Sequence, residues 1–384
     1  MRRLVLAVYL PSVVFSFGDG LLIPTLPLFA ASFDVSLWLV GVALAAEALG
    51  MLVADAPVGW LLRRIPQKYA MLLGGAITTG AALATAFAPN LAVIIILRVL
   101  AGVGLALFGI TRHAYLARAT RGGRRGTAIA AYGGVQRLGV FVGPAVGGAV
   151  ATLFGLRAPF MLYALLGGVA LLLMARFLPY EEAYTGAVTS LRARRALRLA
   201  TPALVSGGIG QLLGQAVRAG RKVLIPLFAS EVLGLGAFDV GLVVSLSGLI
   251  DMLFFYPAGW LMDVRGRKFA IIPCFIVMAL GMALVPFTTS FATLLGAALL
   301  IGVGNGLGSG TMMTLGADLA PEAAAGEFLG LWRMIGDAGM VGGPLLVGAV
   351  AQVTTLGVSA GAVALVSAAA AWWFAQRVPE TLER

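Results

Sequence analysis

The chain has few charged residues and almost none of the residues that form disulfides or metal sites. Only 11% of its 384 residues are Asp, Glu, Lys or Arg, whereas 60% are hydrophobic. A soluble protein of this length needs far more charged surface, so the composition argues against a large globular fold in water. The single cysteine, Cys274, excludes an internal disulfide, and the single histidine, His113, has no H-E-x-x-H or C-x-x-C motif beside it. We therefore expect no metal site and no cofactor, and no set of residues for catalysis is apparent.

Long apolar segments make up most of the chain. Each is roughly 20 residues or longer, which is enough to cross the ~30 Å hydrocarbon layer of a membrane. The first resembles a signal peptide at its start, but its apolar run continues to about residue 31 and therefore indicates a span. We expect twelve membrane-spanning helices, over residues 5–31, 36–61, 69–89, 91–115, 126–153, 158–178, 201–229, 238–262, 269–288, 291–318, 326–352 and 357–377.

The net charge of +11 is distributed unevenly among the expected loops. If the N-terminus is cytoplasmic, alternate loops carry nearly all of the loop arginines and lysines, and the opposite loops carry only Arg157. This is the positive-inside asymmetry, which predicts that both termini are cytoplasmic. It favours a multi-pass protein of the cell inner (plasma) membrane over a nucleic-acid-binding protein.

An internal repeat relates the two halves of the chain. Residues 59–71, GWLLRRIPQKYAM, match residues 259–271, GWLMDVRGRKFAI, at an offset of 200 positions, and the same offset relates glycines elsewhere. A repeat that spans half the chain predicts two similar domains. We expect an N-terminal six-helix bundle over residues 1–178, a cytoplasmic linker over 179–200 and a C-terminal six-helix bundle over 201–384.

The loop at 259–268 carries a recognisable motif. The pattern G-x-x-x-D-x-x-G-R-[KR] after the second helix of each half is typical of the major facilitator superfamily, which this chain resembles over essentially its whole length. The resemblance implies an all-α integral membrane fold of twelve helices in two pseudo-symmetric bundles. In the first half Arg63, Pro66 and Gln67 replace the expected Asp, Gly and Arg, so the resemblance assigns a gating role to the second loop. The residues that fit the motif are Gly259, Asp263, Gly266, Arg267 and Lys268.

The fifth span contains a glycine- and proline-rich pattern. Proline removes a helix hydrogen bond and glycine lets a neighbouring helix approach, so a bent and closely packed helix is expected. The pattern resembles the one found on the fifth helix of drug–proton antiporters of the superfamily, although simple packing also explains it. Its residues are Gly139, Gly143, Pro144, Gly147 and Gly148. The glycines between 302 and 310 also lie in an apolar span, where they favour close helix packing over dinucleotide binding.

Three charged residues of the first half lie deep within expected spans. Asp19 and Glu47 are carboxylates at a depth where an ionised group is costly and is paired or protonated. Arg98 begins an R-x-x-x-G-x-G run that resembles the family element in which a fourth-helix arginine assists proton transfer. These residues are candidates for proton coupling. The alternatives are a structural ion pair for Asp19 and a purely structural role for Arg98.

The seventh span carries polar side chains at helical spacing, and three of them are cations. Because cations at this depth avoid lipid, we expect them to line a watery cavity. By resemblance, helices one, four, seven and ten line that cavity, and Asp19, Arg98 and Arg218 would meet near its centre. The candidate cavity residues are Asp19, Arg98, Gln211, Gln215, Arg218, Arg221, Lys222 and Asn305.

The remaining buried charges fall on spans that form the seam between the halves in this superfamily. From their depths we predict two pairs across the seam, Arg137 with Asp251 and Asp55 with Arg333. Asp337, one turn from Arg333 on the same helix, is a competing local partner.

Two functions remain open from the sequence. The first is export of small amphipathic, drug-like molecules by proton antiport with alternating access. The second is transport of organic anions or anionic lipids, uniport included, because the cations of the seventh span outnumber Asp19. An enzyme or a channel is disfavoured by the lack of a catalytic set or a selectivity ring. The expected partners are the small-molecule substrate, protons and membrane lipids, and we expect a monomer.

Overall fold

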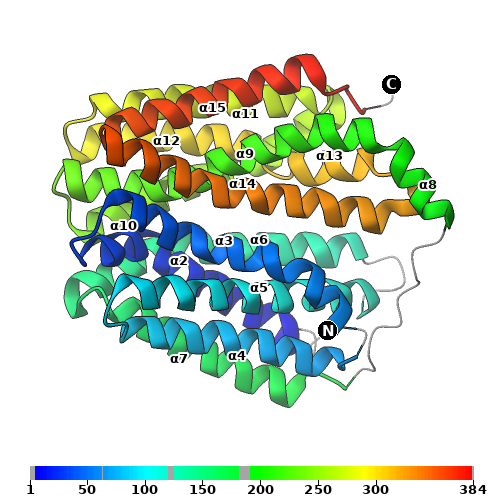
Figure 1. Ribbon diagram of the computed structural model, residues 1–384, viewed down its shortest axis with the longest axis horizontal. Helices are drawn as coiled ribbons and strands as arrows, with labels where there is room; N and C mark the ends of the chain where they lie inside the picture. The colour runs from blue at the N-terminus through cyan, green and yellow to red at the C-terminus, as the bar shows by residue number, and fades with distance from the viewer. Residues whose placement is uncertain (1–4, 63, 120–124, 181–190, 383–384) are drawn as a thin grey trace. The chain divides into compact units, whose positions relative to one another are not determined.

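In the computed structural model the chain is almost wholly helical, and its described part contains no strand (Figure 1). The structure describes residues 5–62, 64–119, 125–180 and 191–382, with side chains for all of these except 56, 59, 60, 114, 116–119, 125–137 and 191–194. The long helices are α2 Leu10–Ala31, α3 Leu37–Leu61, α4 Gln67–Ala86, α5 Leu91–Ala119, α6 Arg125–Phe154, α7 Ala158–Phe177, α9 Thr201–Leu227, α10 Ala237–Val264, α11 Lys268–Leu284, α12 Phe291–Leu307, α14 Ala325–Val353 and α15 Leu356–Arg377. The shorter elements are η1 Val5–Tyr9, α8 Leu191–Leu199, η2 Phe228–Val232, η3 Val285–Phe287, α13 Thr311–Leu319 and η4 Glu322–Ala324.

Every expected span coincides with a helix to within a few residues, which confirms the all-α membrane fold. Ten helices in the described part of the chain are long and apolar enough to cross a membrane, and Leu138–Phe154 of α6 is a shorter apolar helix. Helix α9 is outside this set, and its sequence contains Gln211 and Gln215 in the middle and three cations in the second half. The tenth expected span differs from the prediction, since it is interrupted between α12 and α13.

The chain folds into two compact units. Unit 1 comprises Met1–Val35, Val42–Gly186 and Gly236–Ser245, and unit 2 comprises Ser36–Gly41, Ala187–Leu235 and Leu246–Arg384. The first turns of α3 and α10 thus belong to a different unit from the rest of the same helix. The expected domain limits at residues 178 and 201 stay a prediction.

The same helix pairs pack together in both units. In unit 1, α2 packs against α6 and α7, while α4 packs against α5 and α7. In unit 2, α9 packs against α14 and α15, while α11 packs against α12 and α15. Each pair in unit 2 is the repeat counterpart of a pair in unit 1, so the repeat found in the sequence extends to the packing.

Glycines at the repeat offset make equivalent contacts. A Cβ on Gly102 would collide with the carbonyl oxygen of Glu47, and one on Gly302 would lie 2.5 Å from the carbonyl oxygen of Ser247. Glycines of α6 and α14 meet α2 and α9 in the same way: a Cβ on Gly143 or Gly343 would meet backbone atoms of the neighbouring helix. Close backbone approach through small residues is the usual way in which membrane helices associate.

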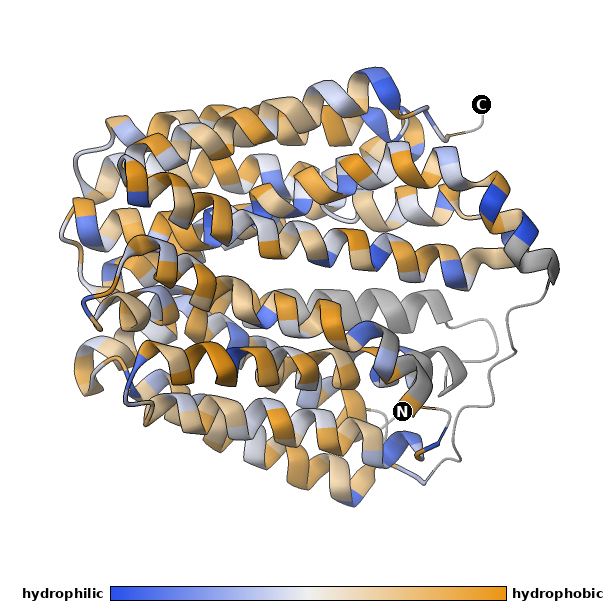
Figure 2. Cartoon of the chain, viewed as in Figure 1, coloured by the Kyte–Doolittle hydropathy of each residue, from blue (hydrophilic) through white to orange (hydrophobic). Residues whose placement is uncertain are grey.

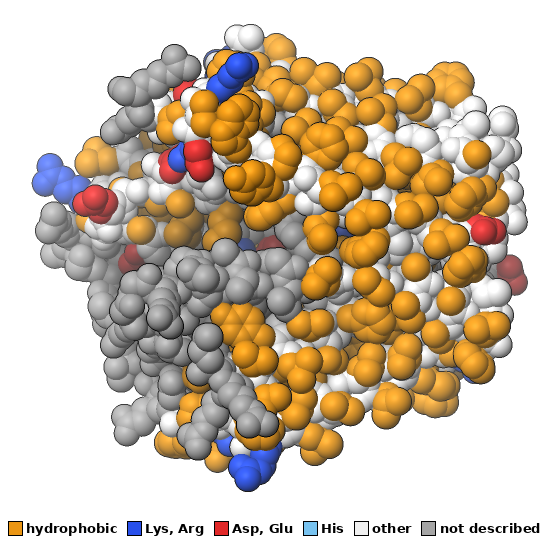
Figure 3. Space-filling view, turned by 180° about the vertical axis from the view of Figure 1, so that it is seen from behind, with side chains coloured by type: hydrophobic (Ala, Val, Ile, Leu, Met, Phe, Trp, Pro, Cys, Tyr) orange, Lys and Arg blue, Asp and Glu red, His pale blue; other side chains and the backbone are white. Residues whose placement is uncertain are grey.

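The surface of the helices is apolar. Figure 2 shows apolar residues along much of the long helices that it colours, and Figure 3 shows apolar side chains over much of the visible face. Leu153, Leu172 and Leu365 are each more than 70% exposed. Exposed leucines at this density suit contact with lipid tails rather than with water.

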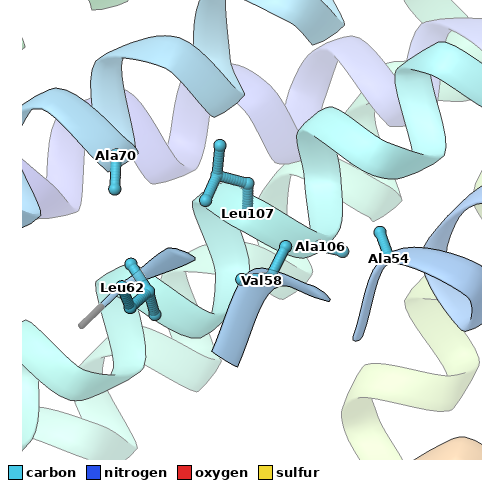
Figure 4. Close-up of a cluster of buried hydrophobic side chains, with 6 residues drawn as sticks. All are labelled: Ala54, Val58, Leu62, Ala70, Ala106 and Leu107. Carbon is cyan, nitrogen blue, oxygen red and sulfur yellow. The ribbon is translucent and has the colours of Figure 1, made fainter. Parts of the chain in front are cut away.

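A buried apolar cluster joins the end of α3 to α4 and α5 (Figure 4). It is built from side chains of both sides of the α3–α4 connection and from the second half of α5. The cluster fixes α3 beside α5, which positions the charged side chains described below. Its buried members are Ala54, Val58, Leu62, Ala70, Ala106 and Leu107.

Candidate functional site

Two carboxylates, one arginine and one tyrosine gather inside unit 1. Glu47 on α3 forms an ion pair with Arg98 on α5, between Oε2 and Nη2, and the two side chains are only 25% and 11% exposed. Asp19 on α2 accepts a hydrogen bond from the hydroxyl of Tyr163 on α7 at 3.3 Å. Tyr163 also lies within electrostatic range of Glu47 and Arg98. We call Asp19, Glu47, Arg98 and Tyr163 the acidic cluster.

Glycines hold the helices of the acidic cluster close together. On α3, a Cβ at Gly50 would collide with the carbonyl oxygen of Val99, one residue from Arg98. On α2, a Cβ at Gly18 would collide with the ring of Tyr163. The charged groups are therefore set in place by backbone contacts between α3 and α5 and by the approach of α7 to α2.

The corresponding place in unit 2 has no charges. Ser247 and Ala298 stand 200 positions after Glu47 and Arg98, and the Ser247 hydroxyl donates to the carbonyl oxygen of Ala298 at 2.7 Å. The same helix–helix contact is thus made by an ion pair in one unit and by a side chain–backbone hydrogen bond in the other. The fold itself does not require the arginine.

Unit 2 contains its own polar cluster, in which cations predominate. Arg218 on α9 donates from Nη2 to the carbonyl oxygen of Gly308 at 3.0 Å, and its guanidinium lies 5.9 Å from the ring centroid of Phe275. The thiol of Cys274 also lies within electrostatic range of this guanidinium. Arg221, one turn along α9, lies within electrostatic range of Arg218 and of Asp251 on α10.

Asp251 is the acid of this cluster. Its Oδ2 accepts a hydrogen bond from Nδ2 of Asn305 at 2.6 Å, and its Oδ1 accepts one from the hydroxyl of Ser309 at 3.2 Å. We call Arg218, Arg221, Asp251, Asn305 and Ser309 the basic cluster. It has two guanidinium groups for one carboxylate, and it brings together Arg218, Arg221 and Asn305, which are three of the candidate cavity residues.

A break in the tenth span supplies part of the basic cluster. Helix α12 ends at Leu307, and α13 begins at Thr311 after Gly310, whose φ is +77° in the left-handed region. The Gly308 carbonyl, released from the helix ladder, accepts from Arg218 and also from the hydroxyl of Thr311. Non-helical backbone at membrane depth is tolerated where it faces protein or a cavity. The glycines of the run NGLGSG at 305–310 therefore mark this break, and their interpretation as helix packing alone is incomplete.

Several buried polar atoms of α9 and α12 have no hydrogen-bond partner within the described part of the chain. They are Oε1 of Gln211, Nε of Arg218 and Oδ1 of Asn305. Gln211 and Gln215 lie against Gly336 and Gly339 of α14, where Cβ atoms would come within 2.6 Å and 3.1 Å of their side chains. Lys222 is exposed. Buried polar groups are nearly always satisfied, so unpartnered ones mark places where water or a ligand binds.

The loop between α10 and α11 is tied to two other segments of unit 2. Arg267 donates from Nε to Asp318 Oδ2 on α13 at 2.9 Å, and its Nη1 lies 3.2 Å from Oδ1 of Asp263. These partners raise the pKa of the Arg267 guanidinium, the hydrogen bond with Asp318 most strongly. Motif residues Asp263 and Arg267 are therefore in contact. Asp318 is a partner that the sequence does not indicate, because it lies 51 residues further along the chain.

The segment after α15 closes over the same loop. The Glu380 carboxylate accepts from the backbone N–H groups of Arg267 at 2.8 Å and Lys268 at 3.0 Å. Partial burial by itself would raise the pKa of Glu380, but these backbone N–H donors, with those of Thr381 and Leu382, hold it below its ordinary value. Gly266 has a φ of +120°, and a Cβ there would lie 2.5 Å from the same carboxylate.

The predicted seam pairs stay predictions. The side chain of Arg137 lies outside the described residues, and Asp55 and Arg333 belong to different units. Within unit 2, Nε of Arg333 lies 3.6 Å from Oδ2 of Asp337, which is the local alternative considered from the sequence.

Comparison with known proteins decides the family. The model of the Major Facilitator Superfamily matches residues 8–219 and again 207–384, once for each half. The chain belongs to the major facilitator superfamily. It is accordingly a multi-pass membrane transporter with a small-molecule substrate, and this family is one of transporters rather than enzymes.

Relatives within the superfamily are distant. An uncharacterized transporter of this type from Methanocaldococcus jannaschii is 23% identical over 360 residues, covering 92% of each chain. Among solved structures, a D-xylose–proton symporter is 16% identical with a TM-score of 0.78 and covers 99% of this chain and 98% of its own. The human organic anion transporter TETRAN is 16% identical with a TM-score of 0.69 and covers 97% of this chain and 99% of its own. These structures share the fold alone with this superfamily member.

Proposed function

We propose that this transporter exports small amphipathic molecules in exchange for protons, by alternating access of its two halves. The observation that carries the proposal is the ion pair between Glu47 and Arg98, at a place where the repeat counterpart has only Ser247 and Ala298. A costly charged pair that the packing does not need is best explained by function.

The acidic cluster has the groups that proton coupling requires. A carboxylate beside a guanidinium favours its charged form, and it takes up a proton more readily when the two are separated. A conformational change that separates the two side chains would therefore couple proton uptake or release to transport. Asp19 is a second acid within the same cluster, and Tyr163 links it electrostatically to the pair. We assign proton binding to Glu47 and Asp19. We assign to Arg98 the role of changing how readily these carboxylates take up a proton.

The test is transport in vesicles that contain the purified protein, with ethidium as the probe and an imposed pH gradient. Wild type should accumulate ethidium against its gradient. E47Q and D19N should lose accumulation and keep downhill exchange, and the variant with the larger loss identifies the main proton site. E231Q, which removes an exposed acid of η2, is the matched control and should behave as wild type. Transport that ignores the pH gradient in wild type would contradict the antiport proposal.

A second candidate function is favoured by the basic cluster. Its two arginines against one aspartate, together with the unpartnered Arg218 Nε and Asn305 Oδ1, suit an anionic group on the substrate. Under this alternative the protein transports organic anions or anionic lipids.

Carboxyfluorescein should then stabilise the purified protein against heat while ethidium should not. R218Q should abolish the stabilisation by carboxyfluorescein. Stabilisation by ethidium alone would instead favour the cation exporter.

The orientation and assembly of the transporter follow from the same proposal. The excess of arginine in alternate loops supports an inner-membrane protein with both termini in the cytoplasm. We expect a monomer, because each transporter of this design contains both halves of its pathway in one chain. Accessibility of a terminal epitope tag in intact and permeabilised cells tests the orientation.

A further inference from the structure

Unit 2 has a surface cavity that is separate from both polar clusters. It has a volume of about 780 Å³ and lies where α8, the start of α9 and the end of α15 meet. Its lining combines two arginines with apolar and aromatic side chains. The residues that matter are Arg198, Thr201, Val205, Ile209, Trp373 and Arg377.

The two arginines lie at the same end of the cavity. Arg198 precedes the first turn of α9, and Arg377 is the last residue of α15, so both stand where these helices end. Both are exposed, and neither forms an ion pair with any residue that the structure describes. Two guanidinium groups at one cavity, without an acidic partner in the described segments, attract an anion, and their planar donors fit phosphate oxygens.

The lining becomes apolar with distance from the arginines. Along α9, Val205 and Ile209 follow Thr201 at helical spacing and are 54% and 37% exposed. On α15, Trp373 stands one turn before Arg377, and its indole Nε1 donates to the carbonyl oxygen of Ser206 at 2.7 Å, which fixes the ring against α9. Tryptophan in this position is typical of the level of lipid headgroups.

We propose that this cavity binds one anionic phospholipid. Its phosphate lies between Arg198 and Arg377, and an acyl chain follows Val205 and Ile209 beside the Trp373 ring. The occupant comes from the bilayer leaflet at this end of α9 and α15. An anionic headgroup followed by an apolar chain matches a lining that begins with arginines and continues with apolar side chains. The basic helix α8, which leads directly into α9, thereby becomes attached to the membrane surface.

Native mass spectrometry of the full-length protein tests the proposal, with dioleoyl phosphatidylglycerol, dioleoyl phosphatidylcholine and inorganic phosphate as separate probes. R198Q/R377Q should bind phosphatidylglycerol about 30-fold more weakly, which corresponds to about 1 kcal/mol for each cation near an anionic headgroup. The control R195Q/R265Q removes the same charge from exposed arginines outside the cavity and should bind as wild type.

Three outcomes would overturn the proposal. Equal loss of lipid in both double variants would mean that net charge alone is responsible. Unchanged binding in R198Q/R377Q would exclude the two arginines. Binding of inorganic phosphate as tightly as phosphatidylglycerol would mean that the cavity holds a free anion and not a lipid. As a second measurement, I209S should weaken the binding of dioleoyl phosphatidylglycerol and leave the binding of dihexanoyl phosphatidylglycerol unchanged. An equal effect on the binding of both lipids would exclude the proposed path of the acyl chain.

Discussion

At the scale of single residues, the ion pair of Glu47 and Arg98 is the feature with the clearest energetic consequence. The Arg98 side chain is 11% exposed and its Nε has no hydrogen-bond partner within the described residues, so Glu47 provides most of the compensation for its charge. Removing one member of such a pair leaves the other charge uncompensated, whereas removing both does not.

We therefore predict strong coupling between the two positions. E47Q and R98M should each lower the free energy of unfolding by about 3 kcal/mol, and the double variant by much less than the sum. Thermal unfolding of the purified protein in detergent gives the comparison. The control S247A tests the uncharged counterpart, where only one hydrogen bond to a backbone carbonyl is lost. Additive effects of E47Q and R98M would contradict the interaction.

Charged residues of the site were predictable, but their partners were not. Asp19, Glu47 and Arg98 stand out because a charge within an apolar span is rare. The sequence does not mark Tyr163 and Ser309 as site residues, because a single hydroxyl-bearing side chain on a helix is as often part of the packing as part of a functional site. The resemblance leads us to expect Asp19, Arg98 and Arg218 near one centre. Inside unit 1 the structure pairs Arg98 with Glu47 and places Asp19 against Tyr163. Their meeting with Arg218, which belongs to unit 2, stays a prediction.

At the scale of elements, the two halves differ most in their fourth helices. Helix α5 is continuous from Leu91 to Ala119, whereas its counterpart is divided into α12 and α13 by a turn at Gly310. The apolar composition of residues 291–318 predicts one span but not the break within it, because hydropathy is insensitive to the backbone angles of a glycine. The break frees the carbonyl that Arg218 uses, so it belongs to the basic cluster.

Substitution of Gly310 should cost stability through its backbone conformation. An alanine in the left-handed region is strained, and G310A should lower the free energy of unfolding by about 1 kcal/mol. G296A is the matched control, since its Cβ would meet nothing within 4 Å and it lies inside α12. That variant should be neutral or slightly stabilising. Equal behaviour of the two variants in thermal unfolding would rule out strain at Gly310.

The glycines at helix contacts should not tolerate substitution by alanine in either half. A Cβ on Gly102 or Gly302 would press on a backbone carbonyl of α3 or α10, and neither can move without shifting a helix. G102A and G302A should each destabilise by about 2 kcal/mol, as overpacking does in a tight core. G80A, with nothing within 4 Å of the added Cβ, should not. Thermal unfolding of the three variants measures the difference.

At the scale of the whole molecule, the segment after α15 links the end of the chain to the α10–α11 loop. Glu380 binds backbone N–H groups more than 110 residues away in sequence. The lowered pKa of Glu380 means that this contact stabilises the folded state above the pH at which a free glutamate ionises. The stabilisation is lost as the pH falls through the lowered pKa.

We predict that acidification releases this segment. A spin label at L382C should become more mobile below the ordinary titration range of glutamate, and E380Q should make it mobile at neutral pH. Hydrogen exchange at the Arg267 and Lys268 amides should rise in E380Q for the same reason. E322Q, an exposed acid of η4, is the control and should leave both readouts unchanged. A label that is equally mobile at all pH values would contradict the contact.

The predicted pairing of Asp55 with Arg333 can be separated from the local pair by exchange of charges. If the partner of Arg333 across the halves is Asp55, transport lost in D55R should return in D55R/R333D. If the local contact with Asp337, at 3.6 Å, is the important one, R333D/D337R should be the combination that restores transport. Ethidium efflux from cells that express each variant measures the result.

The equivalence of the glycine contacts has a consequence for how such a protein changes over evolutionary time. The repeat has persisted where an added methyl group would strike another backbone, as at Gly104 and Gly304, which meet Gly74 and Cys274 at the same offset. It is absent at the buried ion pair of unit 1, where Glu47 corresponds to Ser247 and Arg98 to Ala298. After a duplication, selection for packing and selection for cargo therefore act on different positions of the same helices. A lineage can acquire a new substrate without rebuilding the scaffold that moves it.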